Sequence, residues 1–154
     1  MTKPEVTINA GQEKVIQFSI FIENRVGALL HLVNYFYAQR VTILASSIVD
    51  TADCAIDRFV VDDPDRARLC LHEHGFLFSE RPVVVVELQK GAMQLRELLS
   101  VLYAGECNIH SIYSFMIQPR GYPCIAIHVD DDEVASSVLQ AAGYQTLKQS
   151  DLAR

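Results

Sequence analysis

Hydrophobic and polar positions change their spacing along the chain, and these changes divide it into short predicted elements. From Val15 to Ile22 apolar and polar residues alternate, which predicts a strand. Apolar residues then recur at the three- and four-residue spacing of one helix face: Val26, Leu29, Leu30, Val33 and Phe36. The β-branched runs Val41–Val49 and Ala55–Val61 follow, with a turn between them, and predict a hairpin.

A second helix and a short strand complete this first set of elements. Asp62-Asp63-Pro64 supplies an N-cap and a proline for the first helical turn, and Gly75 marks the expected C-terminal end. The apolar run Phe76–Ser79 predicts a closing strand. The predicted order is therefore βαββαβ.

The second half of the chain repeats this pattern. A shift of 66 positions aligns Tyr37 with Tyr103, and a shift of 68 aligns Gly75 with Gly143. The change of shift places two extra residues in the second hairpin. The repeat predicts strands at 83–88, 108–117, 123–129 and 144–149, and helices at about 92–103 and 132–142.

The repeat and the element order together predict an α+β fold. We expect two tandem ferredoxin-like βαββαβ units, each an antiparallel sheet with helices on one face. Their predicted boundaries are residues 15–80 and 81–154, joined at Glu80-Arg81-Pro82, after an N-terminal arm at residues 1–14.

Composition narrows the class of protein. The formal net charge of −6 disfavours direct binding to nucleic acid or to an anionic membrane. The sequence lacks an apolar run of about 18 residues and a secretory pattern at its start, so we expect a cytoplasmic protein. The scattered cysteines, which form no C-x-x-C pair, are expected to be apolar fillers: Cys54, Cys70, Cys107 and Cys124.

Residues with catalytic or metal-binding chemistry occur without a supporting constellation. Cys70 and His74 share a helix face, but two ligands without a third make a poor transition-metal site. The acidic run at 130–133 opens a predicted helix, where capping is favoured over cation binding. His31, His110 and His128 have no evident catalytic partner. We therefore expect no catalytic residue, no metal, no cofactor and no enzymatic activity.

The first strand-to-helix turn, Glu23-Asn24-Arg25-Val26-Gly27, is the main candidate for binding. Asn24 can cap the helix, and Gly27, expected in its first turn, lets another group approach the backbone. Unpaired N–H groups and the helix dipole favour a carboxylate at this position. The alternative is that these residues only cap, contact solvent and pack.

Two stretches connect the repeat to a known family. "IENRVGALLHLVNYFYAQRVTI" and "AGECNIHSIYSF" resemble the strand–turn–helix region of the ACT domain family of amino-acid-sensing regulatory modules. The resemblance extends from about Val15 to Leu152 as two copies, as in small stand-alone proteins made of two ACT domains. RNA-binding modules and metallochaperones share the topology, but the chain lacks their base-stacking strand and their paired-cysteine loop.

The resemblance implies a function and a set of site residues. ACT domains typically bind an amino acid between the strand-to-helix turn of one domain and the second strand of a neighbouring domain. Carried over by position, the candidates are Asn24, Arg25, Val26, Gly27, Ala28, Ser46 and Ser47. The alternative for Ser46 and Ser47 is that their hydroxyl groups form hydrogen bonds only with neighbouring residues of the sheet.

The resemblance also implies how the protein works. We expect a non-enzymatic regulatory protein that binds a small amino acid or related metabolite and signals its occupancy to a regulated enzyme or regulator protein. We also expect a homodimer, because short edge strands such as Phe76–Ser79 and Tyr144–Gln149 leave partner surfaces open. Two alternatives remain: an interaction scaffold without ligand, and an enzyme that uses Cys70 with a histidine.

The second turn departs from the first. A shift of 66 places Gln89–Met93 opposite Glu23–Gly27, which loses the glycine, whereas a shift of 64 aligns Gly91 with Gly27. The sequence leaves both alignments open. Whether this turn binds a ligand is therefore open as well.

Overall fold

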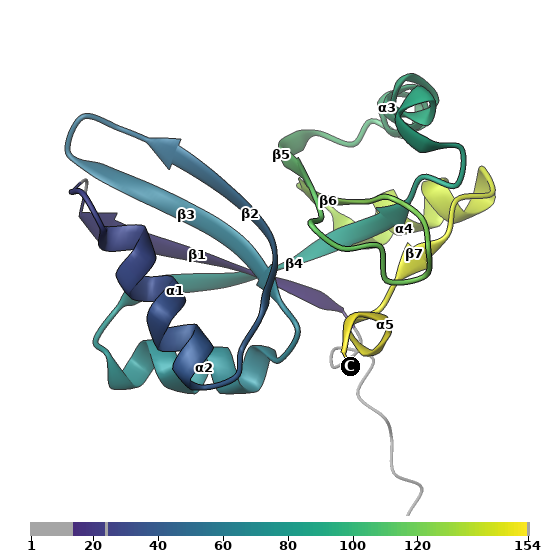
Figure 1. The fold of residues 1–154 in the computed structure, drawn as a ribbon. Coiled ribbons are helices and arrows are strands. Elements are labelled where there is room, and N and C mark those ends of the chain that lie inside the picture. The colour runs from purple at the N-terminus through teal and green to yellow at the C-terminus, as the bar shows by residue number, and fades with distance from the viewer. Residues whose placement is uncertain (1–13, 24, 154) are drawn as a thin grey trace, which may run out of the picture.

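The computed structural model describes residues 14–23 and 25–153. The first half contains β1 (Val15–Glu23), α1 (Ala28–Ala38), β2 (Ile43–Asp50), β3 (Cys54–Val61) and α2 (Pro64–Glu73). The second half contains η2 (Gly91–Gln94), α3 (Leu95–Ala104), β5 (Ile109–Ser114), β6 (Cys124–Val129), α4 (Asp132–Ala141), β7 (Thr146–Leu147) and α5 (Gln149–Leu152). Between them β4 (Leu77–Glu87) runs from one half into the other (Figure 1).

The long strand β4 belongs to both units. The sheet order is β2-β3-β1-β4-β6-β5, and β7 also pairs with β4. In β4, Val83 pairs with Val15 of β1, whereas Val84 pairs with Ile127 of β6. The same strand is therefore the fourth strand of the first unit and the first strand of the second. Both units have the order second–third–first–fourth, and all pairs are antiparallel.

This arrangement confirms the α+β class and the paired ferredoxin-like units, and it corrects one detail. The expected strand Phe76–Ser79, the joint Glu80-Arg81-Pro82 and the expected strand Val83–Leu88 are largely one continuous strand. Pro82 is tolerated inside β4 because this half of the strand pairs on one side only, with β1. At the C-terminus the expected strand 144–149 shrinks to β7, and a short helix follows.

The repeated aspartate pairs have the same roles in both units. Asp63 accepts a hydrogen bond from Arg66 N at 3.1 Å and caps α2, and Asp131 caps α4 through Val134 N at 3.0 Å. The preceding aspartate binds the start of the second strand: Asp62 accepts from Thr42 N and Asp130 from Asn108 N. The preference for capping over cation binding at 130–133 is thus confirmed for Asp131.

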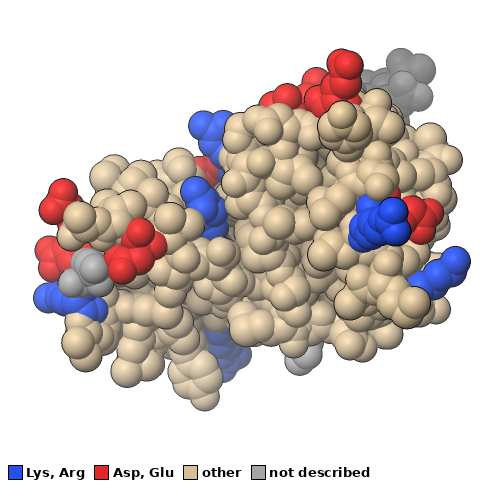
Figure 2. Space-filling view, turned by 90° about the horizontal axis from the view of Figure 1, so that it is seen from above, with Lys and Arg blue, Asp and Glu red and all other residues tan. Residues whose placement is uncertain are grey.

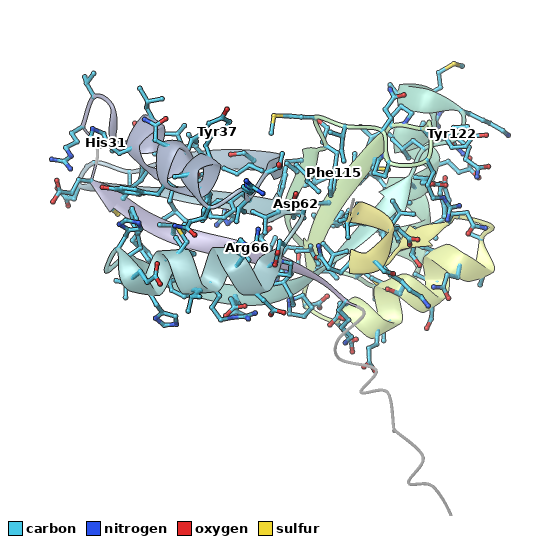
Figure 3. All side chains as sticks on the ribbon, turned by 60° about the horizontal axis from the view of Figure 1, so that its bottom comes forward. His31, Tyr37, Asp62, Arg66, Phe115 and Tyr122 are labelled. Atoms are coloured by element: carbon cyan, nitrogen blue, oxygen red, sulfur yellow. The ribbon has the colours of Figure 1, made fainter. Side chains whose placement is uncertain are left out.

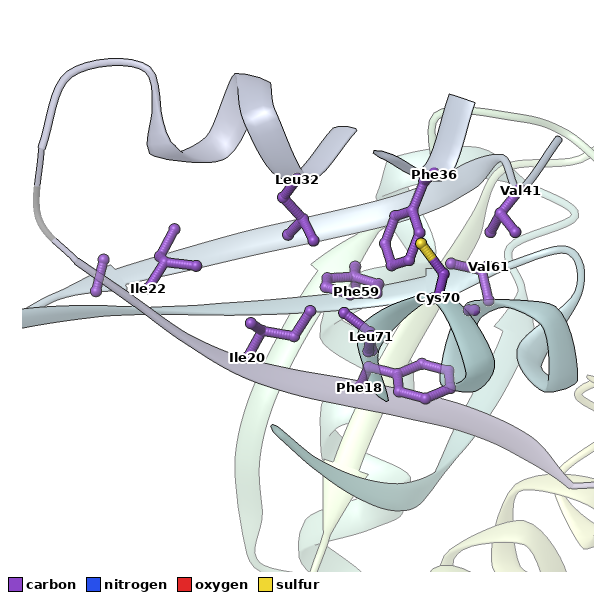
Figure 4. Packing of buried hydrophobic residues seen from close by; sticks show 12 residues of the cluster. Phe18, Ile20, Ile22, Leu32, Phe36, Val41, Phe59, Val61, Cys70 and Leu71 are labelled. Atoms are coloured by element: carbon purple, nitrogen blue, oxygen red, sulfur yellow. The ribbon is translucent and has the colours of Figure 1, made fainter. Parts of the chain in front are cut away.

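Each unit has its own core between sheet and helices. In the first, Phe59 stacks on Phe18 with ring centroids 5.8 Å apart and meets Phe36 edge-on at 5.3 Å (Figure 4). The equivalent core of the second unit contains Val84, Leu98, Leu102, Ile127 and Leu139. Alternation along the strands places the strand residues of both cores on the helix-covered faces of their sheets.

A third core joins the two units on the open faces of their sheets. It contains Val15, Leu44, Val60, Val83, Val85, Tyr113, Ala126 and Leu147, with Phe115 packed against it (Figure 3). Met116 N donates to Leu44 O at 2.8 Å, and Tyr113 Oη donates to Gln17 Oε1 at 2.7 Å. The two units therefore share buried surface and hydrogen bonds.

Among the described residues, the helices are too short or too polar to cross a bilayer.

Candidate functional site

Gly27 forms the corner between β1 and α1. Its φ of 85° is in the left-handed region, and α1 begins at the next residue, Ala28. Gly27 is therefore the N-cap residue, and its expected place in the first helical turn is wrong. The expected capping role of Asn24 lies outside the described residues.

The N-terminal end of α1 presents backbone donors beside this corner. Ala28 N donates to Arg25 O at 3.2 Å, and His31 N donates to Gly27 O at 3.0 Å. Among described residues, no backbone acceptor meets the N–H groups of Leu29 and Leu30. A helix N-terminus with such donors attracts a carboxylate.

A cavity of about 410 Å³ lies beside the turn. The end of β1 contributes Glu23, the turn contributes Arg25, and α1 contributes Ala28, His31 and Tyr35. The far wall is the segment that leaves α2, with His74, Gly75, Phe76 and Leu77. The cavity thus combines one acidic and one basic side chain with aromatic walls.

Aromatic contacts hold the wall of this cavity in place. Tyr35 stacks on His74 with ring centroids 3.8 Å apart, and it meets Phe76 edge-on at 6.1 Å. Figure 3 shows His31 on the part of α1 near the turn, whereas Tyr37 lies farther along the helix. His31 and Tyr35 share a helix face at i, i+4 spacing. None of His31, Tyr35 and His74 was expected as a site residue, although the i, i+4 spacing of His31 and Tyr35 is visible in the sequence.

The charged side chains of the turn are exposed to solvent. Arg25 Nε lies 3.5 Å from Glu23 Oε2, and both side chains are mostly exposed. Val26 is fully exposed and does not line the cavity. Arg25 and Ala28 are therefore the predicted residues that the structure brings to the cavity wall, with Gly27 at the corner.

The structure does not bring the two predicted serines to this cavity. Ser46 Oγ donates to Asp57 Oδ1 at 2.9 Å, across the β2–β3 pair on the helix-covered side. Ser47 pairs with Arg58 and faces the opposite side of the sheet. Within one chain these hydroxyl groups are therefore separate from the first turn.

The second turn resolves the two alignments that the sequence left open. In the strands the shift of 66 holds, because Val84–Ile127 matches Phe18–Phe59 in register. At the glycine the shift of 64 holds, because Gly91 has a φ of 74° and repeats the corner of Gly27. The two extra residues are taken up by the 3₁₀ turn η2, before α3 begins at Leu95.

A different kind of cavity lies beside this second turn. It measures about 340 Å³ and is mainly apolar, with Leu88, Ala92 and Leu95 on one side and Phe115, Ile117 and Pro123 on the other. The segment that follows β5 therefore covers the second turn. The described residues that line this cavity include no acidic and basic pair like Glu23 and Arg25.

Cys70 of α2 and His74, the residue that caps the C-terminal end of α2, make packing contacts. Cys70 is buried in the first core, and burial raises the pKa of its thiol. His74 stacks on Tyr35 instead of facing Cys70 as a ligand. Among the described residues, no three His, Cys, Asp or Glu side chains gather as a metal site would require.

Comparison with known proteins places this architecture. A crystal structure of protein BT0572 from Bacteroides thetaiotaomicron matches with a TM-score of 0.82 and 27% identity, over 92% of this chain and 97% of that one. The ligand-free regulatory subunit of aspartate kinase from Thermus thermophilus matches with a TM-score of 0.60 and 14% identity, over 84% and 91%. The regulatory subunit of aspartate kinase from Thermus flavus matches with a TM-score of 0.56 and 13% identity, over 85% of this chain and 94% of that one.

The two aspartate kinase subunits are similar in fold alone, at these identities. No curated protein matches the sequence. The family model of the ACT domain pair matches residues 13–154, which is nearly the whole chain. The repeated units, the shared strand β4 and this match show that the chain belongs to the ACT domain pair family.

Proposed function

We propose that this protein is a non-enzymatic regulator that binds a small amino acid or related metabolite at the cavity beside the first turn. The observation that carries the proposal is a combination of three features: Gly27, first-turn donors on α1 that meet no backbone acceptor among the described residues, and a cavity with Glu23 and Arg25. A carboxylate suits the helix N-terminus and Arg25, and an ammonium group suits Glu23. At about 410 Å³ the cavity can hold such a molecule together with water.

Regulation would follow from differential binding. A ligand that contacts the turn in one arrangement of domains or subunits favours that arrangement by its difference in affinity. Ser46 is exposed on β2, an edge strand, and is available to a ligand held by another copy. A regulated enzyme is the favoured partner, since regulatory subunits of aspartate kinase share the fold.

The binding test is a thermal-shift screen of each standard amino acid, followed by calorimetric titration of any that raises the melting temperature. We expect Arg25→Gln to weaken binding of that amino acid at least tenfold, because it removes the cation beside the helix N-terminus. Lys90→Gln, at the second turn, is the matched control and should leave affinity unchanged.

A glycine pair separates binding from stability. Gly27→Ala and Gly91→Ala both force a side chain into the left-handed region, so each should lower the free energy of unfolding by about 1 kcal/mol. Only Gly27→Ala should also weaken binding. Equal affinities in all four variants, or no amino acid that stabilises the parent, would favour the scaffold alternative.

Exposed apolar side chains support the expectation of a homodimer. Leu30 and Tyr37 on α1, and Leu99 and Tyr103 on α3, are exposed on equivalent helix faces. Short edge strands give this expectation less support, because the expected strand Phe76–Ser79 belongs largely to the long strand β4, whereas β7 is short. We expect light scattering to give a dimer mass at micromolar concentration. The double variants Tyr37→Lys/Leu30→Lys and Tyr103→Lys/Leu99→Lys test the two helix faces, and at least one of them should lower the measured mass. A parent that stays monomeric would contradict this expectation.

A further inference from the structure

The open faces of the two sheets carry a group of basic side chains that the proposed function does not use. On the first sheet, Arg58 of β3 pairs with Ser19, and Arg81 of β4 pairs with Gln17. Directly paired residues lie on the same face, so the two arginines flank the β1 residues Gln17 and Ser19. This face is opposite to the one that α1 and α2 cover.

The second sheet faces this row of residues. Tyr113 of β5 donates to Gln17 Oε1 at 2.7 Å, so the two sheets meet at this point. His128 of β6 lies on the same face as Tyr113, and the ring of His110 is 5.0 Å from that of His128. Burial lowers the pKa of His128, and the nearby positive charges of His110, Arg81 and Arg58 lower it further.

We refer to these four residues, Arg58, Arg81, His110 and His128, as the basic cluster. Among the described residues, neither Arg58 nor Arg81 forms an ion pair. The acidic side chains of the same strands lie elsewhere: Asp57 and Glu80 on the helix-covered faces, Glu87 against Arg120, and Glu23 near Arg25.

Such a cluster is unexpected in a chain with a formal net charge of −6, because like charges that are close together repel. Hydroxyl groups are also in place to bind an anion. Ser111 lies opposite His128 in the β5–β6 pair. Its Oγ is buried and has no hydrogen-bond partner among the described residues. Ser19 and Ser47 lie on either side of Arg58 on the first sheet, and Ser79 pairs with Ser19 on the next strand. From above, Lys or Arg side chains flank the hollow between the two halves, next to a smaller acidic patch (Figure 2).

We propose that the basic cluster binds a small multivalent oxyanion, either a phosphate group or a dicarboxylate, between the open faces of the two sheets. Guanidinium groups form paired hydrogen bonds with both kinds of anion. Arg58 and Arg81 belong to the first unit, and His110 and His128 to the second, so the anion bridges the two units. The site is separate from the cavity at the first turn and goes beyond the proposed function.

The test is calorimetric titration of the full chain with inorganic phosphate and, separately, with succinate. The parent should bind at least one of them, and Arg58→Gln and Arg81→Gln should each weaken that binding at least tenfold. Arg96→Gln, on the exposed face of α3, is the matched control and should bind as the parent does. Circular dichroism and melting temperature identify any variant that has not folded.

A second readout follows the histidines directly. The C2–H resonance of His128, assigned with His128→Gln, should titrate at higher pH when the bound anion is present, because negative charge favours the imidazolium. Binding of phosphate alone, or of succinate alone, would identify the anion class. Failure of the parent to bind either anion, or equal affinities in the arginine variants and Arg96→Gln, would overturn the proposal. Amino-acid binding at the first turn is unaffected by either result.

Discussion

Asp57→Asn is expected to make the protein more stable than the parent at neutral and alkaline pH, and the difference should disappear in acid. Asp57 is completely buried on the helix-covered side of β3, between Ile20 and Ile48. Ser46 donates to Oδ1, but Oδ2 has no partner among the described residues. Burial raises the pKa of Asp57 from 3.8 to about 6, and the Ser46 hydrogen bond opposes this rise.

The direction in which stability changes with pH follows from proton binding at Asp57. Between pH 3.8 and about 6 the folded protein binds more protons at Asp57 than the unfolded chain does, so stability falls as pH rises through this window. The loss is complete above about pH 7 and amounts to about 3 kcal/mol, since one pKa unit corresponds to about 1.4 kcal/mol. Asparagine has the same shape and does not ionise, so its variant escapes this loss.

Urea unfolding of both proteins from pH 4 to pH 8 measures the difference directly. Other titrating groups contribute equally to both proteins and cancel in the comparison. Ser46→Ala is the informative companion: it removes the hydrogen bond that opposes the rise in the pKa of Asp57, so its stability should fall over a wider pH range and by a larger total. Parallel stability curves for the parent and Asp57→Asn would show that Asp57 does not titrate in this window.

Arg120→Ala is the second change with a large expected effect. Glu87, at the end of β4, is fully buried, and Arg120 Nε lies 2.8 Å from its Oε1. Removing the arginine leaves a buried carboxylate without its counter-charge, which costs about 3–5 kcal/mol in buried pairs. Because Arg120 is itself half-exposed, we expect a loss at the lower end of this range.

A double variant separates the ion pair from simple packing. Glu87→Gln removes the buried charge, so Arg120→Ala/Glu87→Gln should recover most of the stability that Arg120→Ala loses. Arg96→Ala, an exposed arginine on α3, should change the free energy of unfolding by less than about 0.5 kcal/mol. Additive effects of Glu87→Gln and Arg120→Ala would contradict the interpretation. The pair also fixes the loop between β5 and β6, which covers the cavity beside the second turn.

The local pattern of the sequence determined most of the secondary structure. Periodicity identified the strands and helices of both units, because one face of each element is buried and repeats with the period of that element. The aligned aspartates and glycines were sufficient to predict where the second helix of each unit begins and ends, since caps depend on a few neighbouring residues. The repeat then predicted two units of the same topology, and the structure confirms that topology.

Long-range pairing was decided by the tertiary structure. From the sequence, Glu80-Arg81-Pro82 is predicted to join the two units, because proline and charged residues usually interrupt strands. In the structure β1 pairs through this segment, and Arg68 binds Glu80 from α2 through Nε and Nη2. The all-apolar run Val83–Val86 was a signal of a strand buried on both faces, which here means between a helix layer and the core shared by the units.

The candidate sites show the same division. The sequence located the turn at Glu23–Gly27, because a glycine and a helix start are local features, but it placed Gly27 inside the first helical turn instead of at the corner before it. It could not assign His31, Tyr35 and His74 to one cavity, since His74 is far from the turn in sequence and only the packing of α2 beside α1 brings it close. Nor could it collect Arg58, Arg81, His110 and His128, which lie on four strands. Strand register and the closure of two sheets on each other decide which side chains meet, and neither is encoded in any short stretch of the chain.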